Sequence, residues 1–242
     1  MLEAAFWGFV GGFALIVGAV IGLVLRTPPR VVGIVMAFGA GVLISAVAFE
    51  LVEEGFESGG AVPVLLGLAG GALAFFVGDT ILDHRGARHR KRSGGQQAGG
   101  AASAIVLGAM LDGIPESAAI GVSLLGGGGV GVAMVAAVFL SNVPESLSAA
   151  VGLRKAGHSP RWILGLWSGV ALISAVAAAA GYGLLGGASP VAVAAVQAFA
   201  AGAVLTMLAD TMMPEGFEHV GDSTGLVTCA GFITAFLLHQ AG

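Results

Sequence analysis

Apolar runs of about 20 residues dominate this chain and constrain what it can fold into. We predict eight of them, over 3–25, 31–52, 61–82, 101–125, 130–153, 162–185, 190–213 and 223–241. Each is long enough to cross a bilayer as a helix. Charged residues make up only 10% of the chain, against about 25% in soluble domains. The sequence therefore predicts one all-α transmembrane domain over residues 1–242, with eight transmembrane helices.

All ten Lys and Arg residues fall in three of the connections between these runs, after the first, third and fifth. With eight crossings, these connections lie on one side of the membrane, and the positive-inside rule assigns that side to the cytoplasm. We therefore expect a multi-pass protein of the cell membrane with both termini outside. The segment 84–100 is basic and then rich in Gly, Ser and Gln. It is expected to be a disordered cytoplasmic loop.

Two of the runs carry the same short signature near their centres, DGIPES over 112–117 and SNVPES over 141–146. An ionisable group at that depth is costly and by default marks a functional site. The proline in each signature removes one helix hydrogen bond. Carbonyl groups freed in this way persist at membrane depth only where they line a cavity or find other partners. Each run therefore offers a carboxylate beside exposed backbone oxygen.

Five oxygen-bearing side chains in these signatures form the predicted metal site: Asp112, Glu116, Glu145, Asn142 and Ser141. Asp112 and Glu116 are four residues apart and share one helix face. Three carboxylates cannot all stay ionised in a dry core without a counter-charge. Because no Lys or Arg lies in any run, we expect that charge to be a bound cation or protons. Oxygen donors in this number suit a divalent metal ion.

A second repeat relates the second run to the seventh. FGAG at 38–41 matches FAAG at 199–202, and EGFE occurs at both 54–57 and 215–218, without a gap in the alignment. The second and seventh runs cross in opposite directions in the predicted topology, and so do the fourth and fifth. An inverted repeat demands such pairs, so we expect a pseudo-two-fold axis in the membrane plane.

Other polar residues are weaker candidates. Glu50 and Asp210 lie toward opposite ends of the second and seventh runs and are expected to line the outer and inner halves of a path. Asp79 lies near the cytoplasmic end of the third run and is a further candidate for lining the path. His84 and His89 in the basic loop are candidates for metal capture, although we favour a role of that loop in setting topology.

These features resemble the ZIP (Zrt/Irt-like protein) family of divalent-metal transporters over essentially the whole length. The resemblance rests on eight helices, outside termini, a basic loop with histidines after the third helix, and x-P-E motifs in the fourth and fifth helices. It implies a homodimer-prone bundle in a 3+2+3 inverted-repeat arrangement. It also implies uptake of Zn²⁺, Fe²⁺ or Mn²⁺, with the metal held between the fourth and fifth helices.

The chain departs from the family pattern at its ligands. Asp112 and Ser141 stand where the family has histidines, so the site lacks imidazole. Sites made only of oxygen favour harder ions such as Mn²⁺, Mg²⁺ or Ca²⁺. We expect one metal site, bridged by Glu116 and Glu145.

The expected function is transport of a divalent metal ion as substrate, of the Zn, Mn or Fe class with Cd as a further candidate. We expect the metal ion and the lipid bilayer as partners, and no organic cofactor, enzymatic activity or nucleic-acid partner. The alternatives are a proton or other cation transporter or channel, and a metal-sensing family member that does not transport. An intramembrane enzyme is disfavoured because no run carries HExxH, GxSxG or a paired Gly-Asp motif. A further alternative is that the acids are protonated and only cross-link helices.

Overall fold

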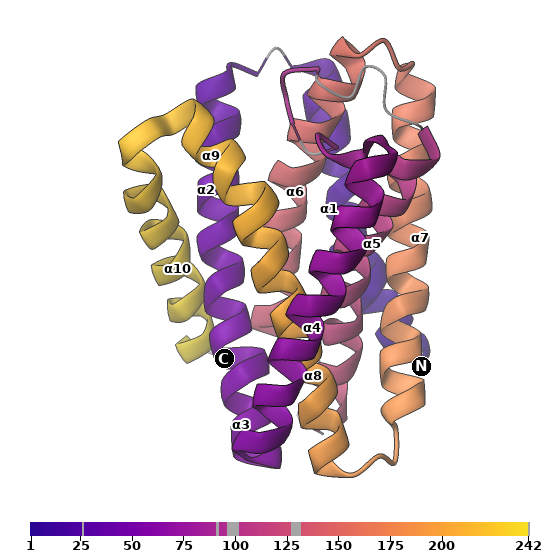
Figure 1. Ribbon diagram of the computed structural model, residues 1–242, viewed down its shortest axis with the longest axis vertical. Helices are drawn as coiled ribbons and strands as arrows, with labels where there is room; N and C mark the ends of the chain where they lie inside the picture. Colours follow the sequence, from indigo (N-terminus) through magenta and orange to yellow (C-terminus); the bar gives the residue numbers. More distant parts are fainter. Residues whose placement is uncertain (26, 91, 96–101, 127–131, 242) are drawn as a thin grey trace.

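The chain forms a bundle of long helices (Figure 1). The computed structural model describes residues 1–25, 27–90, 92–95, 102–126 and 132–241. No strand occurs in this described part of the chain. Seven helical stretches within it are long and apolar enough to cross a membrane. The fold is therefore that of a multi-pass helical bundle, as the composition predicts.

The helical elements follow one another with short connections. In chain order they are α1 (Leu2–Val24), α2 (Pro29–Ala46), the π-helix η1 (Val47–Glu53), α3 (Glu54–Gly59), α4 (Ala61–Leu82), the π-helix η2 (Asp83–Ala87), α5 (Ala102–Ser123), the 3-10 helix η3 (Leu124–Gly126), α6 (Val132–Lys155), α7 (Pro160–Leu185), α8 (Pro190–Met207), the π-helix η4 (Leu208–Met212), α9 (Met213–Val220), the 3-10 helix η5 (Gly221–Ser223) and α10 (Thr224–Ala241). Both α7 and α8 begin at a proline, whose missing N–H is no loss at that position. Ser159 and Ser189 cap these two helices by accepting main-chain hydrogen bonds.

Successive long helices run in opposite directions (Figure 1). The connections that follow α1, α4 and α6 lie at one end of the bundle, at the top of the view, and we call this the loop end. Both chain termini lie in the opposite half. The last apolar stretch, Pro190–Gln240, contains both α8 and α10. The chain reverses between them near Gly221, whose φ is 64°.

Two units of the chain have matched boundaries. α2 (29–46) and α8 (190–207) have equal length, and each boundary of α8 falls 161 positions after its counterpart in α2. A π-helix follows each of them directly, from Val47 and from Leu208. Gly60 and Gly221, with φ values of 82° and 64°, then reverse the chain in both units. The sequence repeat between the second and seventh runs therefore has a structural counterpart, and the two units run in opposite directions (Figure 1).

Equivalent glycine contacts join the two units. α4 lies on α8 where a Cβ on Gly71 would overlap the backbone oxygen of Phe199. α10 lies on α2 where a Cβ on Gly231 would overlap the backbone oxygen of Phe38. Phe38 and Phe199 occupy the same place in the sequence repeat. Because lipid is as apolar as the side chains, helices in a membrane associate through such close backbone packing.

The central and peripheral helices differ in burial. In their most apolar windows, 72% of the residues of α6 and 67% of those of α2 are buried, against 17% for α4. α6 and α2 therefore form the centre of the bundle. Large apolar side chains cover the outer face, as a helix surface in contact with lipid requires. They include Leu65, Leu66, Leu73, Phe76, Leu172, Val176 and Leu226.

The helices of the second and seventh runs are longer than predicted, and the seventh continues past residue 213 to Val220. We predicted that the second run would end at residue 52, but helical structure continues through η1 and α3 to Gly59. The π-helix changes the hydrogen-bond register without ending the helix, and the chain turns only at Gly60.

We expect Gly71→Ala and Gly231→Ala each to lower the thermal unfolding midpoint of the detergent-purified protein. Overpacking a close contact costs about 1–3 kcal/mol, and here the obstacle is backbone that cannot rotate away. Gly169→Ala is the matched control, because a Cβ at that position meets nothing within 4 Å. Unfolding followed by intrinsic fluorescence measures the effect. Equal midpoints for Gly71→Ala and Gly169→Ala would contradict the close contact of α4 with α8.

Candidate functional site

A basic side chain from the connection after α4 lies inside the bundle. Gly86, with φ at 101°, turns the chain, and the N–H of Arg90 donates to the carbonyl of Ala87 at 2.9 Å. The Nε and Nη2 atoms of Arg90 donate to the two carboxylate oxygens of Asp112 on α5 at 2.8 and 2.9 Å. Nη2 also donates to Asp79 on α4 at 2.6 Å. Arg90 is 4% exposed and Asp112 1% exposed, so the ion pair is shielded from water.

This arrangement holds a positive charge between two helices. The fork of the guanidinium matches a carboxylate, and such two-bond contacts are among the strongest hydrogen bonds in proteins. Asp83 adds a third acidic group, 3.7 Å from Nη1 of Arg90. Burial alone would lower the pKa of Arg90, but the charges and hydrogen bonds of Asp112 and Asp79 outweigh it and raise that pKa well above its ordinary value. The guanidinium therefore stays charged at any pH that the protein meets.

We predicted from the sequence that no basic residue would balance the buried carboxylates, and that expectation is wrong. Arg90 lies outside every predicted run, but the connection after α4 folds back and carries it into the interior. Its neighbours Arg85 and Arg88 are exposed. No local sequence signal separates Arg90 from them, because its burial depends on where the rest of the chain lies.

All five predicted metal ligands are buried, with none more than 4% exposed. Asp112 of α5 and Glu145 of α6 line one small cavity of about 10 Å³ together with Arg90. A space of that size is close to the least that holds one water molecule. The other lining residues are Ile105, Ala109, Leu153, Leu166 and Trp167. The fold therefore brings the two signatures together through Asp112 and Glu145.

Two of the predicted ligands have other partners in this conformation. Asn142 donates from Nδ2 to the carbonyl of Gly11 on α1 at 3.0 Å. Ser141 donates to the carbonyl of Val138 in its own helix at 3.0 Å. Among the residues that the structure describes, no group of three or more His, Cys, Asp or Glu side chains is close enough to hold a metal ion. The position beside Asp112 is taken by Arg90.

A second buried contact fixes the same connection. Ser93, 3% exposed, donates to Oε1 of Glu215 on α9 from its main-chain N at 2.9 Å and from its Oγ at 2.7 Å. Ser148 on α6 donates to the same oxygen at 3.1 Å. Lys155 donates from Nζ to the carbonyl of Ser93 at 2.8 Å. Glu215 thus anchors a loop residue to α6 and α9, a contact that the sequence repeat containing Glu215 does not predict.

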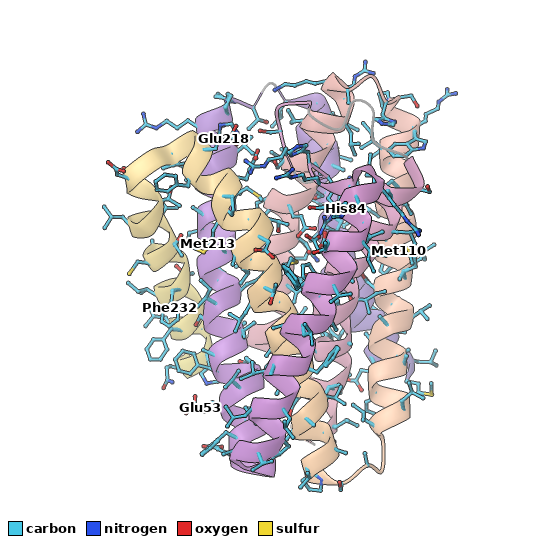
Figure 2. The ribbon with its side chains drawn as sticks, viewed as in Figure 1. Glu53, His84, Met110, Met213, Glu218 and Phe232 are labelled. Carbon is cyan, nitrogen blue, oxygen red and sulfur yellow. The ribbon has the colours of Figure 1, made fainter. Side chains whose placement is uncertain are left out.

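Charged residues surround this anchor at the loop end. Arg92 contacts Glu215 at 3.2 Å and also pairs with Glu218. His219 Nε2 lies 3.2 Å from Oε1 of Glu215 and 3.0 Å from Oγ of Ser93. Figure 2 shows Glu218 at this end of the bundle and Glu53 at the other.

We call residues 88–90 and 92–95 the plug segment, because Arg90 and Ser93 enter the bundle at two separate points. In its described part, the connection that we expected to be disordered over 84–100 is thus folded onto the helices. Residues 91 and 96–100 lie outside the described residues.

A cavity of about 410 Å³ lies beside the plug segment. Asp79 and Asp210, both predicted to line a path, are in its wall, as is His89. The remaining lining residues are Phe76, Thr80, Asp83, Arg88, Arg90, Arg92, Thr211 and Pro214. His84 is not among them, and its Nδ1 lies 2.7 Å from the carbonyl oxygen of Thr80.

Glu50, the other predicted path residue, has a partner on α10. It is 6% exposed and lies in η1, and its Oε1 is 2.6 Å from Nδ1 of His239. The ring of Phe49 stacks on the same imidazole, with 5.6 Å between ring centroids. No sequence signal indicates this contact, because residues 50 and 239 are brought together only by the packing of α10 near the end of α2.

A third cavity, of about 320 Å³, lies at the end away from the basic loops, near α3 and the α7–α8 connection (Figure 1). Its polar lining comes from Glu54, Ser58, Ser123 and Gln197. Gln197 is 6% exposed, so its amide belongs to the interior wall of this cavity.

Comparison with known proteins finds no match, either among protein-family models or among curated proteins.

We expect Glu215→Ala to release the plug segment and to speed tryptic cleavage at its arginines by about tenfold or more, since a buried charged group bonded to several donors contributes well over 1.4 kcal/mol. Glu218→Ala is the matched control, because Glu218 also pairs with Arg92 but is 49% exposed. Cleavage is followed by gel electrophoresis of purified protein. Equal rates for the two variants would show that Glu215 does not anchor the segment.

Proposed function

We propose that this chain is an integral membrane transporter of divalent cations. The observation that carries the proposal is the meeting of Asp112 and Glu145 at one buried point, from two helices that each contain a proline. The positive charge beside them comes from Arg90, whose side chain belongs to a connection and not to a membrane helix. That charge is removable, and a cation that takes its place would satisfy the same carboxylates.

The donor chemistry supports a metal ion as the substrate. Asp112, Glu116 and Glu145 offer carboxylate oxygens, and Asn142 and Ser141 offer further oxygen atoms once their present hydrogen bonds are exchanged. Such a set suits Mn²⁺, Fe²⁺ or Zn²⁺, with Cd²⁺ as a further candidate. Because the site lacks imidazole ligands, it favours the harder ions of this class.

The proposed topology has eight crossings, with α8 and α10 counted separately and α3 and α9 as extensions of α2 and α8. The two repeat units are offset by 161 positions in the chain. This offset supports a 3+2+3 arrangement in which α1, α2 and α4 correspond to α7, α8 and α10, with α5 and α6 between them. The basic connections at the loop end support a cytoplasmic location for that end. Both termini would then be outside, in a protein of the cell membrane.

Two cavities with acidic residues in their walls support a path through the bundle. The cavity lined by Glu54 and Gln197 would admit ions from outside, and the cavity lined by Asp79 and Asp210 would release them at the loop end. Between them lies the buried pair Asp112 and Glu145. Rocking of one repeat unit against the other would expose this pair to each side in turn.

We further propose that the chain is a divergent relative of the ZIP family. The x-P-E motifs in α5 and α6, the basic connection after α4 and the inverted repeat support this relationship. Import as the direction of transport and a homodimeric state follow from the resemblance.

A metal sensor that does not transport is the second candidate. The observation in its favour is that Arg90 already lies beside Asp112, as a fixed counter-ion would in a protein that has lost transport. A proton or other cation transporter or channel would use the same carboxylates. Uptake of metal ions by proteoliposomes separates these candidates from the one we favour.

We expect proteoliposomes with the intact chain to take up Mn²⁺ or Zn²⁺, measured with a trapped metal-sensitive dye. Glu145→Gln and Glu116→Gln should each lower the initial rate by at least about tenfold, because a divalent ion in a low-dielectric site needs the charge of each carboxylate. Glu57→Gln is the control, since Glu57 is exposed. Rates equal to those of empty liposomes for the intact chain would contradict transport and favour the sensor.

We also expect Mn²⁺ or Zn²⁺ to raise the thermal unfolding midpoint of the purified protein. A ligand that binds only the folded state at 100 times its Kd adds about 2.7 kcal/mol. Asp112→Ala/Glu145→Ala should abolish the shift, and Glu57→Gln should keep it. A shift that persists in the double variant would show that the metal ion binds at another site.

A further inference from the structure

We propose that the guanidinium of Arg90 occupies the position that the transported cation takes at Asp112, and that its departure from Asp112 opens the loop end of the path. The inference rests on the proposed function and describes the regulation of the same site. The plug segment would thus be an internal gate that a bound cation releases.

The contacts of Arg90 fit a group that competes with a cation. Its guanidinium bonds both oxygens of Asp112 and also bonds Asp79. A metal ion at Asp112 would need the same oxygens, and two cations cannot share them at bonding distance without strong repulsion. Binding of the ion and insertion of Arg90 therefore exclude each other.

The side chain of Arg90 fits against α5 only because position 108 has no side chain. A Cβ on Gly108 would overlap Cδ of Arg90. The clash would involve a flexible side chain and not a backbone, so a larger residue at this position would expel Arg90 without removing any charge. Gly113, on the same helix, has room for a Cβ, since its nearest neighbour would be 3.6 Å away.

The plug segment couples Arg90 to the closure of the loop end. Three residues beyond Arg90 in the chain, Ser93 is held by Oε1 of Glu215, and the same oxygen accepts a hydrogen bond from Ser148, which is fully buried. Withdrawal of Arg90 pulls on this second contact because so short a stretch of chain joins the two. Ser148 should then meet water.

The repeat allows the end of the bundle that carries the plug segment to be compared with the end that does not. Glu54 and Glu215 hold the same place in the two units, 161 positions apart. Glu215 is covered by Ser93 and is 1% exposed. Glu54 is exposed and lines the 320 Å³ cavity. Both ends are therefore hollow, but at the loop end Arg90 lines the 410 Å³ cavity and also the small cavity at Asp112 and Glu145, so it stands where the two meet.

The order of events follows from this asymmetry. A cation arriving through the cavity at Glu54 reaches Asp112 and Glu145 while Arg90 still separates them from the loop-end cavity. Its charge displaces Arg90, and the plug segment then leaves Glu215. Release of the cation to the loop side lets Arg90 return, so the two ends are not open together.

The test measures access to position 148 by alkylation, which needs no transport. In full-length protein with Cys229→Ala, the thiol introduced by Ser148→Cys should react slowly with a membrane-impermeant maleimide. Adding Arg90→Ala should raise the rate by about tenfold or more, as expected when a buried ion pair that holds the segment is lost. Gly108→Val should do the same with all charges kept, and Gly113→Ala should not. Gel filtration checks that each variant is folded.

A second arm adds Mn²⁺ to the protein with Arg90 intact. Mn²⁺ should speed alkylation at position 148, and the added substitution Asp112→Asn should remove this response. Slow alkylation in both Arg90→Ala and Gly108→Val overturns the proposal, as does an unchanged rate with Mn²⁺ in protein that takes up Mn²⁺. If Arg90→Ala and Gly108→Val open position 148 but no variant takes up metal ions in proteoliposomes, the gate stands and the proposed transport fails.

Discussion

The ion pair between Arg90 and Asp112 governs the interior of this bundle. Few charged groups are available in such an apolar chain, and removing two of them from water costs several kcal/mol per ion. The geometry offsets this cost with two short bonds to Asp112 and one to Asp79. Removing either partner would leave a buried charge uncompensated. Any movement of Arg90 away from Asp112 would therefore need a substitute charge, and this requirement is the basis of the proposed link between a bound cation and the position of the loop.

The inverted repeat sets the frame in which this pair acts. The first helices of the two units, α2 and α8, have equal length, and a π-helix begins at the equivalent position after each. Through reciprocal glycine contacts, each unit packs on the first helix of the other. Their pseudo-symmetry extends to Glu54 and Glu215, which lie at opposite ends of the bundle. The plug segment breaks this symmetry at Glu215. The connection after α4 covers Glu215, and nothing equivalent in the described part of the chain covers Glu54, which lines an open cavity.

Much of the fold could be predicted because its signals are local. The apolar runs predicted membrane-length helices, and the seven stretches of that kind confirm a multi-pass helical bundle. The similar sequences at 38–41 and 199–202 indicated the repeat, since equivalent helix packing in the two units needs similar residues at equivalent positions. The burial of Asp112, Glu116 and Glu145 followed from their depth within apolar runs. Arg90 was missed because it lies among exposed basic residues, and the bond between Glu50 and His239 was missed because 189 positions separate them.

The sequence by itself determined that this chain is helical and suited to a bilayer, because apolar length and the placement of Pro and Gly act within single helices. It also determined that carboxylates are buried in two of those helices. Only the tertiary structure decided which cation balances them. Electrostatic partners are chosen by distance in space, and that distance depends on how a connection folds back over helices far away in the chain. The contact between Asp112 and Arg90 therefore cannot be predicted from any local sequence pattern.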